Sequence, residues 1–328
     1  MAATIKLSVL DQSPVIAGLG ARRAIEETLA LARRTDELGY HRYWLAEHHA
    51  IAALADPCPE VLLARLGAET RRMRIGTGGV LLPYYSAFRT AETFRMLEAL
   101  YPGRIDLGVG RAPGGDPRTA QAVGGGKFPD PSHFPQQVWE LASLLDGTFP
   151  GKHPRLQPEV DTVPEVWLLG SSDYSGALAA ELGLPFAFAH FINPRGGDLV
   201  SQAYRDNFKS RGKPARVIVC TFAIVAESDE EAERLAAPID LRRLHMALNI
   251  DSAVPTHEEA ARHRYSEEER NYVLSQRARA VIGGVEKARQ QLREMVDRYG
   301  ADELMVLTIT GDYDSRRRSY ELLIEAFE

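Results

Sequence analysis

Short apolar runs alternate along the chain with segments in which apolar residues recur every three or four positions. The runs predict buried strands, and the periodic segments predict amphipathic helices. The expected strands are Ile5–Leu10, Arg42–Leu45, Arg74–Thr77, Arg104–Val109, Glu165–Leu169, Phe186–Ala189, Val217–Val225 and Glu303–Ile309. The expected helices are Ala24–Leu38, Glu60–Thr70, Ala87–Leu100, Gln136–Leu145, Tyr174–Leu182, Asp198–Ser210, Glu230–Ala247, Val285–Tyr299 and Arg316–Phe327.

This alternation predicts an α/β fold with a parallel sheet, and eight repeats predict closure into a (β/α)₈ TIM barrel with inserted loops. A doubly wound open sheet is the second possibility. No G-x-G-x-x-G follows the first strand, which weighs against a dinucleotide site of that kind. The pattern shows no break between domains, so residues 1–328 are expected to form a single domain.

Three stretches lack a clear core pattern: Ala112–Pro131, Thr148–Val163 and Asp251–Arg270. Long connections of this kind are often functional or mobile. We expect them to supply the wall of a substrate pocket. The charged third stretch is expected to be a solvated helix or a disordered loop, with a substrate lid as the alternative.

Composition and charge narrow the class of protein. Hydrophobic residues make up 45% of the chain and charged residues 26%, and the formal net charge is −6. No basic run stands out, so nucleic acid is not an expected partner. No window approaches a membrane span and the start does not resemble a signal peptide, so a cytoplasmic protein without a membrane partner is expected. Two cysteines, Cys58 and Cys220, give no disulfide framework and no metal cluster.

Residues able to carry chemistry gather where the predicted strands end. In a barrel of this kind the active site lies at the carboxyl ends of the strands. The residues found there are Glu47, His48, His49, Gly78, Gly79, Arg111, Gly170, Ser171, Ser172, His190 and Asn193. The same face hosts many unrelated functions, so this pattern locates a site without naming its reaction.

Two of these groups favour a phosphorylated ligand. Arg111 offers a planar fork suited to phosphate. Ser171 and Ser172 precede a predicted helix, whose first N–H groups also attract phosphate. The alternatives are a salt bridge from Arg111 to Asp116 or Asp106, and an ordinary helix cap at the serines. Together with the glycines of the third strand, the set favours a flat phosphorylated cofactor.

His48 and His49 are adjacent on an extended segment, so their side chains point to opposite sides. One can therefore face a cavity while the other packs. Adjacency is poor spacing for joint metal binding, so no metal site is expected. An imidazole suits proton transfer near neutral pH, although a packed histidine is the alternative at this position.

Three stretches in this order resemble the bacterial luciferase-like monooxygenase family. They are Tyr43–His49, Arg74–Pro83 and Leu100–Arg111, and the likeness continues through Leu184–Asn193 and Gly300–Met305. The resemblance implies a flavin enzyme on a (β/α)₈ barrel. In this family reduced FMN, supplied by a separate flavin reductase, reacts with oxygen, and the oxygen is then transferred to a small-molecule substrate.

The resemblance also implies roles for single residues. His48 matches the family's catalytic histidine, and Gly78–Gly79 matches a non-prolyl cis peptide under the flavin ring. Arg111 and the Gly170–Ser171 turn match phosphate contacts, with Ser172 and Tyr174 beside them. Family members are commonly dimers, so a homodimer through helices Glu60–Thr70 and Ala87–Leu100 is expected.

The chain departs from the luciferases themselves at two positions. Gly110 stands where they have a reactive cysteine, and His190 stands where they have a tryptophan near the ring. Both differences argue against light emission and against long-chain aldehydes as substrates. A deazaflavin-dependent dehydrogenase of the same superfamily and a non-catalytic FMN-binding protein remain open, and outside the resemblance a metal-dependent hydrolase barrel is the alternative.

Overall fold

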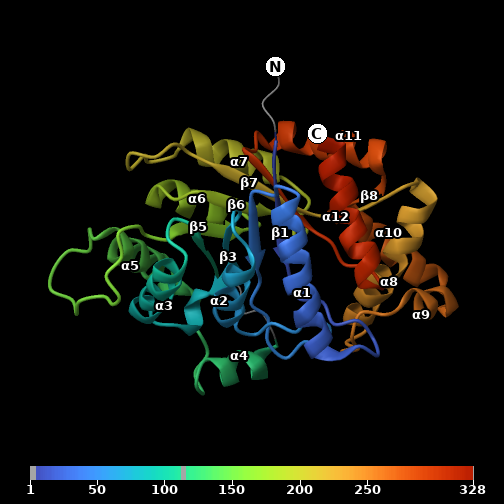
Figure 1. Cartoon of the computed structure of the whole chain (residues 1–328), viewed down its shortest axis with the longest axis horizontal. Helices are drawn as coiled ribbons and strands as arrows, with labels where there is room; N and C mark the ends of the chain where they lie inside the picture. Colours follow the sequence, from blue (N-terminus) through green and yellow to red (C-terminus); the bar gives the residue numbers. More distant parts are fainter. Residues whose placement is uncertain (1–4, 112–115, 328) are drawn as a thin grey trace.

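The computed structural model describes residues 5–111 and 116–327. Its centre is a parallel sheet that closes into a barrel (Figure 1). The barrel strands are β1 (Lys6–Asp11), β2 (Arg42–Leu45), β3 (Arg74–Leu81), β4 (Ile105–Gly110), β5 (Glu165–Gly170), β6 (Phe186–Ala189), β7 (Val217–Ala226) and β9 (Glu303–Leu307). Each pairs with the next in this order, and β9 pairs with β1. The predicted barrel is therefore confirmed, and the open sheet is wrong because β6 pairs with β7.

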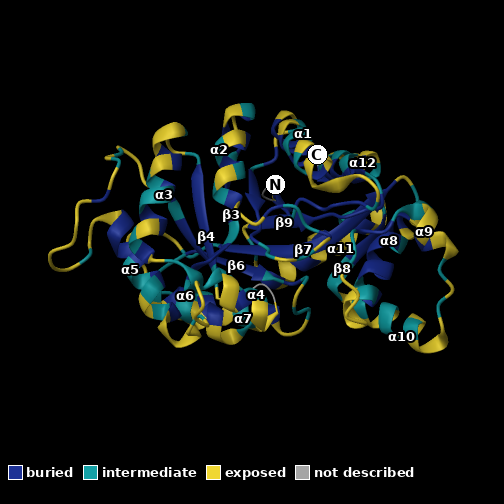
Figure 2. Ribbon diagram, turned by 90° about the horizontal axis from the view of Figure 1, so that it is seen from below, coloured by how far each residue is buried: buried dark blue, intermediate teal, exposed yellow. Residues whose placement is uncertain are grey.

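Helices surround the barrel, with their exposed residues on the outer side and their buried residues toward the sheet (Figure 2). Those that follow the first six strands are α1 (Gly20–Glu37), α2 (Pro59–Glu69), α3 (Ala87–Leu100), α4 (Pro117–Val123), α5 (Phe134–Asp146), α6 (Asp173–Leu182) and α7 (Gly197–Asp206). The later helices are α8 (Asp229–Ala247), α9 (His257–Arg262), α10 (Glu267–Gln276), α11 (Val285–Tyr299) and α12 (Tyr313–Phe327). The short 3₁₀ turns are η1 (Leu82–Tyr84), η2 (Pro131–His133) and η3 (Arg277–Arg279).

The structure corrects two expectations about the elements and decides between two forms expected for a third stretch. A ninth strand, β8 (Ala280–Gly284), pairs only with the second half of β7 and was missed because its run is short and ends in two glycines. Strand β3 continues to Leu81, so Gly78 and Gly79 lie inside the strand, at a register shift, rather than after it. The Asp251–Arg270 stretch forms α9 and begins α10, each with a capping box, so the helix that was one of its two expected forms is confirmed and the disordered loop is wrong.

Buried side chains fill the amino-terminal half of the barrel interior. The guanidinium of Arg42 donates to Asp106 at 2.7 Å and to Glu303 at 2.6 Å, and all three side chains are buried. Trp44 and Trp167 pack edge to face beside them, with ring centres 5.6 Å apart. Space for a ligand is therefore left toward the carboxyl-terminal half of the interior.

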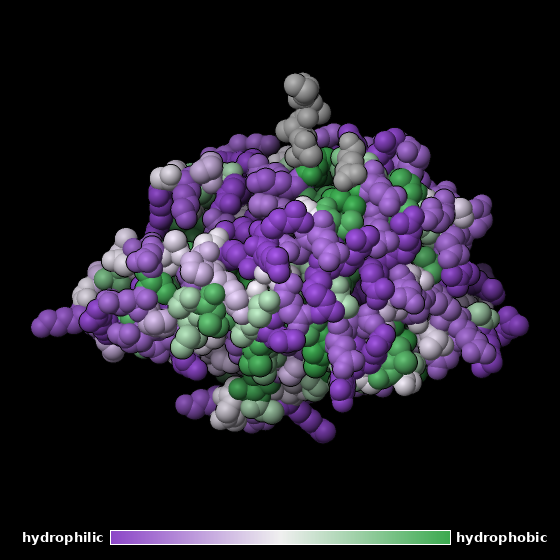
Figure 3. Space-filling view, viewed as in Figure 1, coloured by the Kyte–Doolittle hydropathy of each residue, from purple (hydrophilic) through white to green (hydrophobic). Residues whose placement is uncertain are grey.

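One face of the outer surface is mainly hydrophilic. Figure 3 shows polar residues over most of one face, with apolar residues reaching the surface in small groups. Among the described residues, no helix is long and apolar enough to cross a membrane.

Candidate active site

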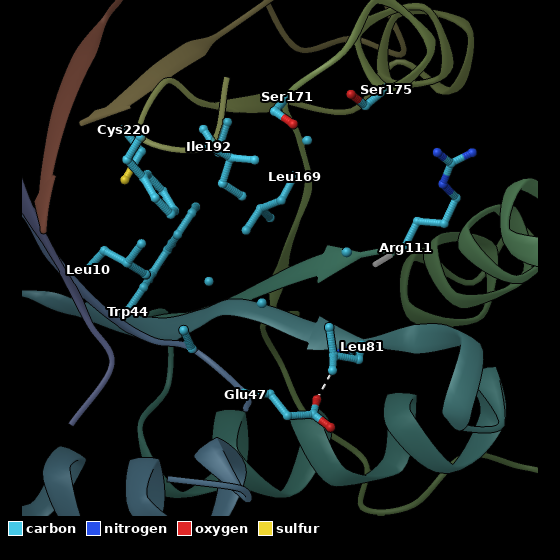
Figure 4. Close-up of a pocket in the computed structure, with 18 of the residues that line it drawn as sticks. Leu10, Trp44, Glu47, Leu81, Arg111, Leu169, Ser171, Ser175, Ile192 and Cys220 are labelled. Carbon is cyan, nitrogen blue, oxygen red and sulfur yellow. Dashed lines mark hydrogen bonds between the residues drawn. The ribbon is translucent and has the colours of Figure 1, made fainter. Parts of the chain in front are cut away.

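One cavity of about 640 Å³ opens at the carboxyl ends of the barrel strands. Its wall includes all eight residues predicted to carry function: His48, Gly78, Gly79, Arg111, Gly170, Ser171, Ser172 and Tyr174. Figure 4 shows Arg111, Ser171 and Ser175 toward one end, with Leu10 and Cys220 toward the other. The sequence thus identified residues that the fold brings to one place.

The polar end is built by the residues that follow β4 and β5. The guanidinium carbon of Arg111 lies 4.5 Å from the centre of the Tyr174 ring, close enough for a cation–π contact. Neither expected salt bridge of Arg111 is present. Asp106 is bonded to arginines and a tryptophan deeper in the barrel, and Asp116 caps α4. Within residues 5–111 and 116–327, the charge of Arg111 therefore has no carboxylate partner and can meet an anion.

The start of α6 lies at the same end. Ser172 is the N-cap of this helix, so the capping alternative is correct for Ser172, and its backbone N–H lies 3.3 Å from Ser175 Oγ. A Cβ at Gly170 would come within 2.1 Å of that oxygen, which explains why a glycine stands there. The side chain of Asn193 donates to the Ser171 carbonyl at 3.0 Å and ties the loop after β6 to this turn.

Gly78 and Gly79 form part of the cavity wall, and the peptide bond between them is cis. A Cβ on Gly79 would lie 2.6 Å from the Gly108 carbonyl oxygen, so the neighbouring strand requires glycine at this position. A Cβ on Gly110 would meet nothing within 4 Å, so open space lies in front of Gly110.

The carboxylate of Glu47 holds the end of β3 in place. It is buried and accepts a hydrogen bond from the Leu81 N–H at 2.8 Å (Figure 4) and another from the Tyr85 hydroxyl at 2.6 Å. His49 Nε2 lies 2.7 Å from the same carboxylate. Both oxygens of Glu47 are thus engaged by the chain itself.

His48 lines the cavity while His49 packs against Glu47, as the alternation of the backbone predicted. Burial lowers the pKa of His48 below its ordinary value of 6.5, although a bond to the Ala46 backbone opposes the shift. Its Nδ1 atom is buried without a hydrogen-bond partner among the residues that the structure describes. A neutral imidazole with one uncommitted nitrogen can hold or accept a proton.

The other end of the cavity is apolar, and sequence reasoning missed most of it. It is lined by side chains from the barrel interior and from the loop after β6: Leu10, Trp44, Leu169, Ala187, Ala189, Phe191, Ile192, Cys220 and Met305. Gln12, next to the end of β1, also lines the cavity. Alternation along β7 would have pointed to Cys220, but β7 is buried on both faces, so its apolar sequence does not reveal which face is interior.

One expectation about the wall is wrong, and a second holds only at Pro131 within the described residues. His190 does not line the cavity; its ring is buried and its Nδ1 lies 2.8 Å from the Tyr299 hydroxyl, because the chain turns sharply after Ala189 and presents Phe191 and Ile192 instead. The described parts of the Ala112–Pro131 stretch contribute only Pro131, and residues 112–115 lie outside the described residues.

The other two unpatterned stretches contribute nothing to the wall. Thr148–Val163 packs on α3 instead, where Thr162 donates to Glu98 and Arg95 donates to the Leu156 carbonyl. Asp251–Arg270 lies against α8, so within the described chain it does not cover the cavity as a lid would.

A family model and the sequences of known proteins both assign the chain to the same family. The model of the family described as luciferase-like monooxygenase matches residues 5–303. A luciferase-like monooxygenase of Escherichia coli strain K12 is 39% identical and covers 99% of this chain and 98% of its own. The N-acetyl-S-alkylcysteine monooxygenase of Bacillus subtilis is 34% identical, with 98% of both chains covered.

Solved structures agree with this result. The crystal structure of apo-MsnO8 is 37% identical, with a TM-score of 0.89 and 98% of both chains covered. At 17% identity, the oxygenating constituent of a 3,6-diketocamphane monooxygenase from Pseudomonas putida, in complex with FMN, has a TM-score of 0.71 over 99% of this chain and 98% of its own. An F420-dependent secondary alcohol dehydrogenase reaches 0.69 at 13% identity, over 99% and 100%. These last two show a shared fold, and one fold thus holds either cofactor.

Proposed function

The chain belongs to the luciferase-like monooxygenase family, and on that premise we propose that it is an FMN-dependent monooxygenase acting on a small organic molecule. One observation carries the proposal. The cavity joins a cationic end, where Arg111 lies beside the start of α6 without a carboxylate partner among the described residues, to an apolar end with few polar side chains. A flat cofactor with a phosphate tail would place its phosphate at the cationic end, and an apolar substrate would lie beside it at the apolar end.

The residues present fit FMN. Arg111, the Ser171 and Ser172 turn and Tyr174 would hold the phosphate, because a guanidinium and helix N–H groups both favour phosphate oxygens. Gly78 and Gly79 would let the ring lie close to the backbone, since neither carries a side chain. Reduced FMN supplies the electrons that activate oxygen.

The remaining work falls to the chain's own side chains. Leu10, Trp44 and Met305 exclude water from the apolar end, which protects a reactive oxygen species from side reactions. His48, kept neutral by burial, holds or accepts a proton at its uncommitted Nδ1. The electrons come from a separate flavin reductase that delivers reduced FMN.

The test is to mix the protein and photoreduced FMN rapidly with oxygenated buffer and to follow flavin absorbance. We expect reoxidation to be slower than for free FMN, and to accelerate with a true substrate. The name of the Bacillus subtilis relative makes N-acetyl-S-alkylcysteines the first substrates to try. Reoxidation as fast as that of free flavin would refute the proposal. Tighter binding of a deazaflavin than of FMN in a parallel titration would indicate the alternative dehydrogenase. Binding of FMN without turnover of any substrate would indicate the alternative FMN carrier.

We also propose that the protein is a homodimer through α2 and α3. These helices contact each other and expose the apolar side chains of Val61, Met96 and Leu100, whose exposed fractions are 69%, 55% and 53%. Large exposed apolar side chains on adjacent helices are typical of an interface between subunits. Analytical ultracentrifugation of the wild-type protein should give the mass of a dimer, and the double variant Val61→Glu with Met96→Glu should give the mass of a monomer. A monomeric wild-type protein would refute the assignment.

A further inference from the structure

Figure 4 shows the apolar end of the cavity, around Cys220, opposite Arg111. A cluster of arginines lies beside Phe222, two residues beyond Cys220 on β7. Arg243 comes from the last turns of α8, and Arg277 and Arg279 come from η3. The guanidinium carbon of Arg243 lies 4.8 Å from the centre of the Phe222 ring on β7. None of these three arginines is used by the FMN site described above.

The positive charge of this cluster is not fully balanced. Arg277 pairs with Asp240, and at 3.1 Å with Glu233. The carboxylate nearest to Arg243 is that of Asp240, at 4.0 Å, and Arg243 Nη1 is buried without a hydrogen-bond partner among the described residues. Arg279 makes no ion pair with any of the residues that the structure describes. Three guanidinium groups therefore face two carboxylates, with one positive charge in excess.

The cluster begins where the cavity wall ends. Cys220 lines the cavity, and Phe222 lies two residues farther along β7 on the same face, a step of roughly 6.6 Å. Phe191, which also lines the cavity, donates its N–H to the Cys220 carbonyl at 3.3 Å. Across the sheet, Phe222 is paired with Ala280, which directly follows Arg279. Arg243 therefore lies beside Phe222, and Arg279 directly precedes Ala280, one step along β7 from the cavity wall; neither arginine lines the cavity itself.

We propose that Arg243, assisted by Arg279, binds the anionic group of the substrate. The substrate class is then an apolar molecule with a carboxylate or a sulfonate at one end, its apolar part against Phe191 and Cys220. This inference rests on the proposed function, since it assigns the substrate of the same cavity.

Two physical arguments support this assignment. A buried guanidinium N–H without an acceptor is costly, and a carboxylate would accept from it through the planar fork of arginine. Burial lowers the pKa of Arg243, and Arg277 and Arg279 lower it further, although Asp240 opposes them. Tyr272, the other titratable group facing Arg243, also raises this pKa. A bound anion would relieve this crowding of positive charge.

The test is calorimetric titration of the FMN-loaded protein with octanoate and with octanamide, which match in size and differ in charge. We expect octanoate to bind at least tenfold more tightly. Arg243→Gln should remove that preference and leave octanamide binding unchanged. Arg234→Gln removes an exposed arginine from the same helix, where it pairs with Glu231, and should change neither ligand.

Equal affinity of the wild-type protein for the two ligands would overturn the inference, and this comparison does not depend on the folding of any variant. Loss of both ligands together in Arg243→Gln would also overturn it, because the side chain would then act through packing. FMN affinity, measured in the same samples, separates the two proposals. Normal FMN binding without octanoate preference refutes only the anion site, whereas failure to bind FMN refutes the proposed function.

Discussion

Replacing Arg111 by alanine should weaken FMN binding by roughly 10- to 150-fold and leave riboflavin binding unchanged. The side chain is exposed, stacks on Tyr174 and has no carboxylate partner in the described chain, so its loss leaves no buried group unsatisfied. A charge-assisted hydrogen bond contributes about 1.5–3 kcal/mol, and each 1.4 kcal/mol corresponds to about a factor of ten in affinity. Riboflavin lacks the phosphate, so it cannot lose this contribution.

Flavin fluorescence titration of both ligands against the wild type and the variant measures the difference. Arg118→Ala, which removes an exposed arginine from α4 outside the cavity wall, is the matched control and should bind both flavins normally. Arg111→Lys keeps the charge but loses the planar fork, so its affinity for FMN should lie between that of the wild type and that of Arg111→Ala. Equal losses for FMN and riboflavin, or no loss at all, would refute phosphate binding by Arg111.

Three further predictions concern buried ionisable groups beside the site. Glu47→Ala leaves the Leu81 N–H without an acceptor and should lower the free energy of unfolding in urea by about 3 kcal/mol, with Glu47→Gln losing less; an unchanged midpoint contradicts the role of Glu47. Burial raises the pKa of Asp56 from 3.8 to about 7, so the folded protein binds more protons than the unfolded chain between these values and stability falls as pH rises. Asp56→Asn should therefore stabilise the protein at pH 8 but much less at pH 5, and a gain independent of pH would argue against a buried charge. The pKa of His48 is lowered, so just below pH 6.5 the unfolded chain binds more protons than the folded protein, and wild-type stability falls as the pH is lowered through this range. His48→Ala should remove this pH dependence and should slow turnover far more than it weakens FMN binding. Full activity in the variant would disprove a role of His48 in proton transfer.

The barrel and the polar end of the cavity could be predicted because both depend on local sequence. Each barrel strand is an apolar run followed by a helical period, and the carboxyl end of such a run must face the site. Arg111 follows β4 directly and Ser171 follows β5 directly, so their place along the chain fixed their place in the fold. Strand β8 was not predicted because its run is only five residues long and ends in two glycines.

The apolar end could not be predicted in the same way. Apolar residues cover both faces of β7, so its sequence does not distinguish Cys220 inside the barrel from its neighbours outside. His190 was misplaced for a different reason. Its orientation depends on a turn after β6 and on the Tyr299 hydroxyl from α11, a contact 109 residues away in sequence. A polar side chain at a strand end therefore marks the right region without giving the direction in which it points.

Neighbouring residues in the segment from Glu47 to His49 have different roles, one structural and one in proton transfer. Side chains two residues apart on an extended segment share a face, and the Glu47 carboxylate lies 2.7 Å from His49 Nε2. That carboxylate also binds the end of β3, so Glu47 positions the strand that carries Gly78 and Gly79. His48 takes the opposite face and keeps an unpartnered nitrogen within the described chain. A change at Glu47 should thus alter the shape and stability of the proposed flavin site, whereas a change at His48 should alter proton transfer within a site of unchanged shape.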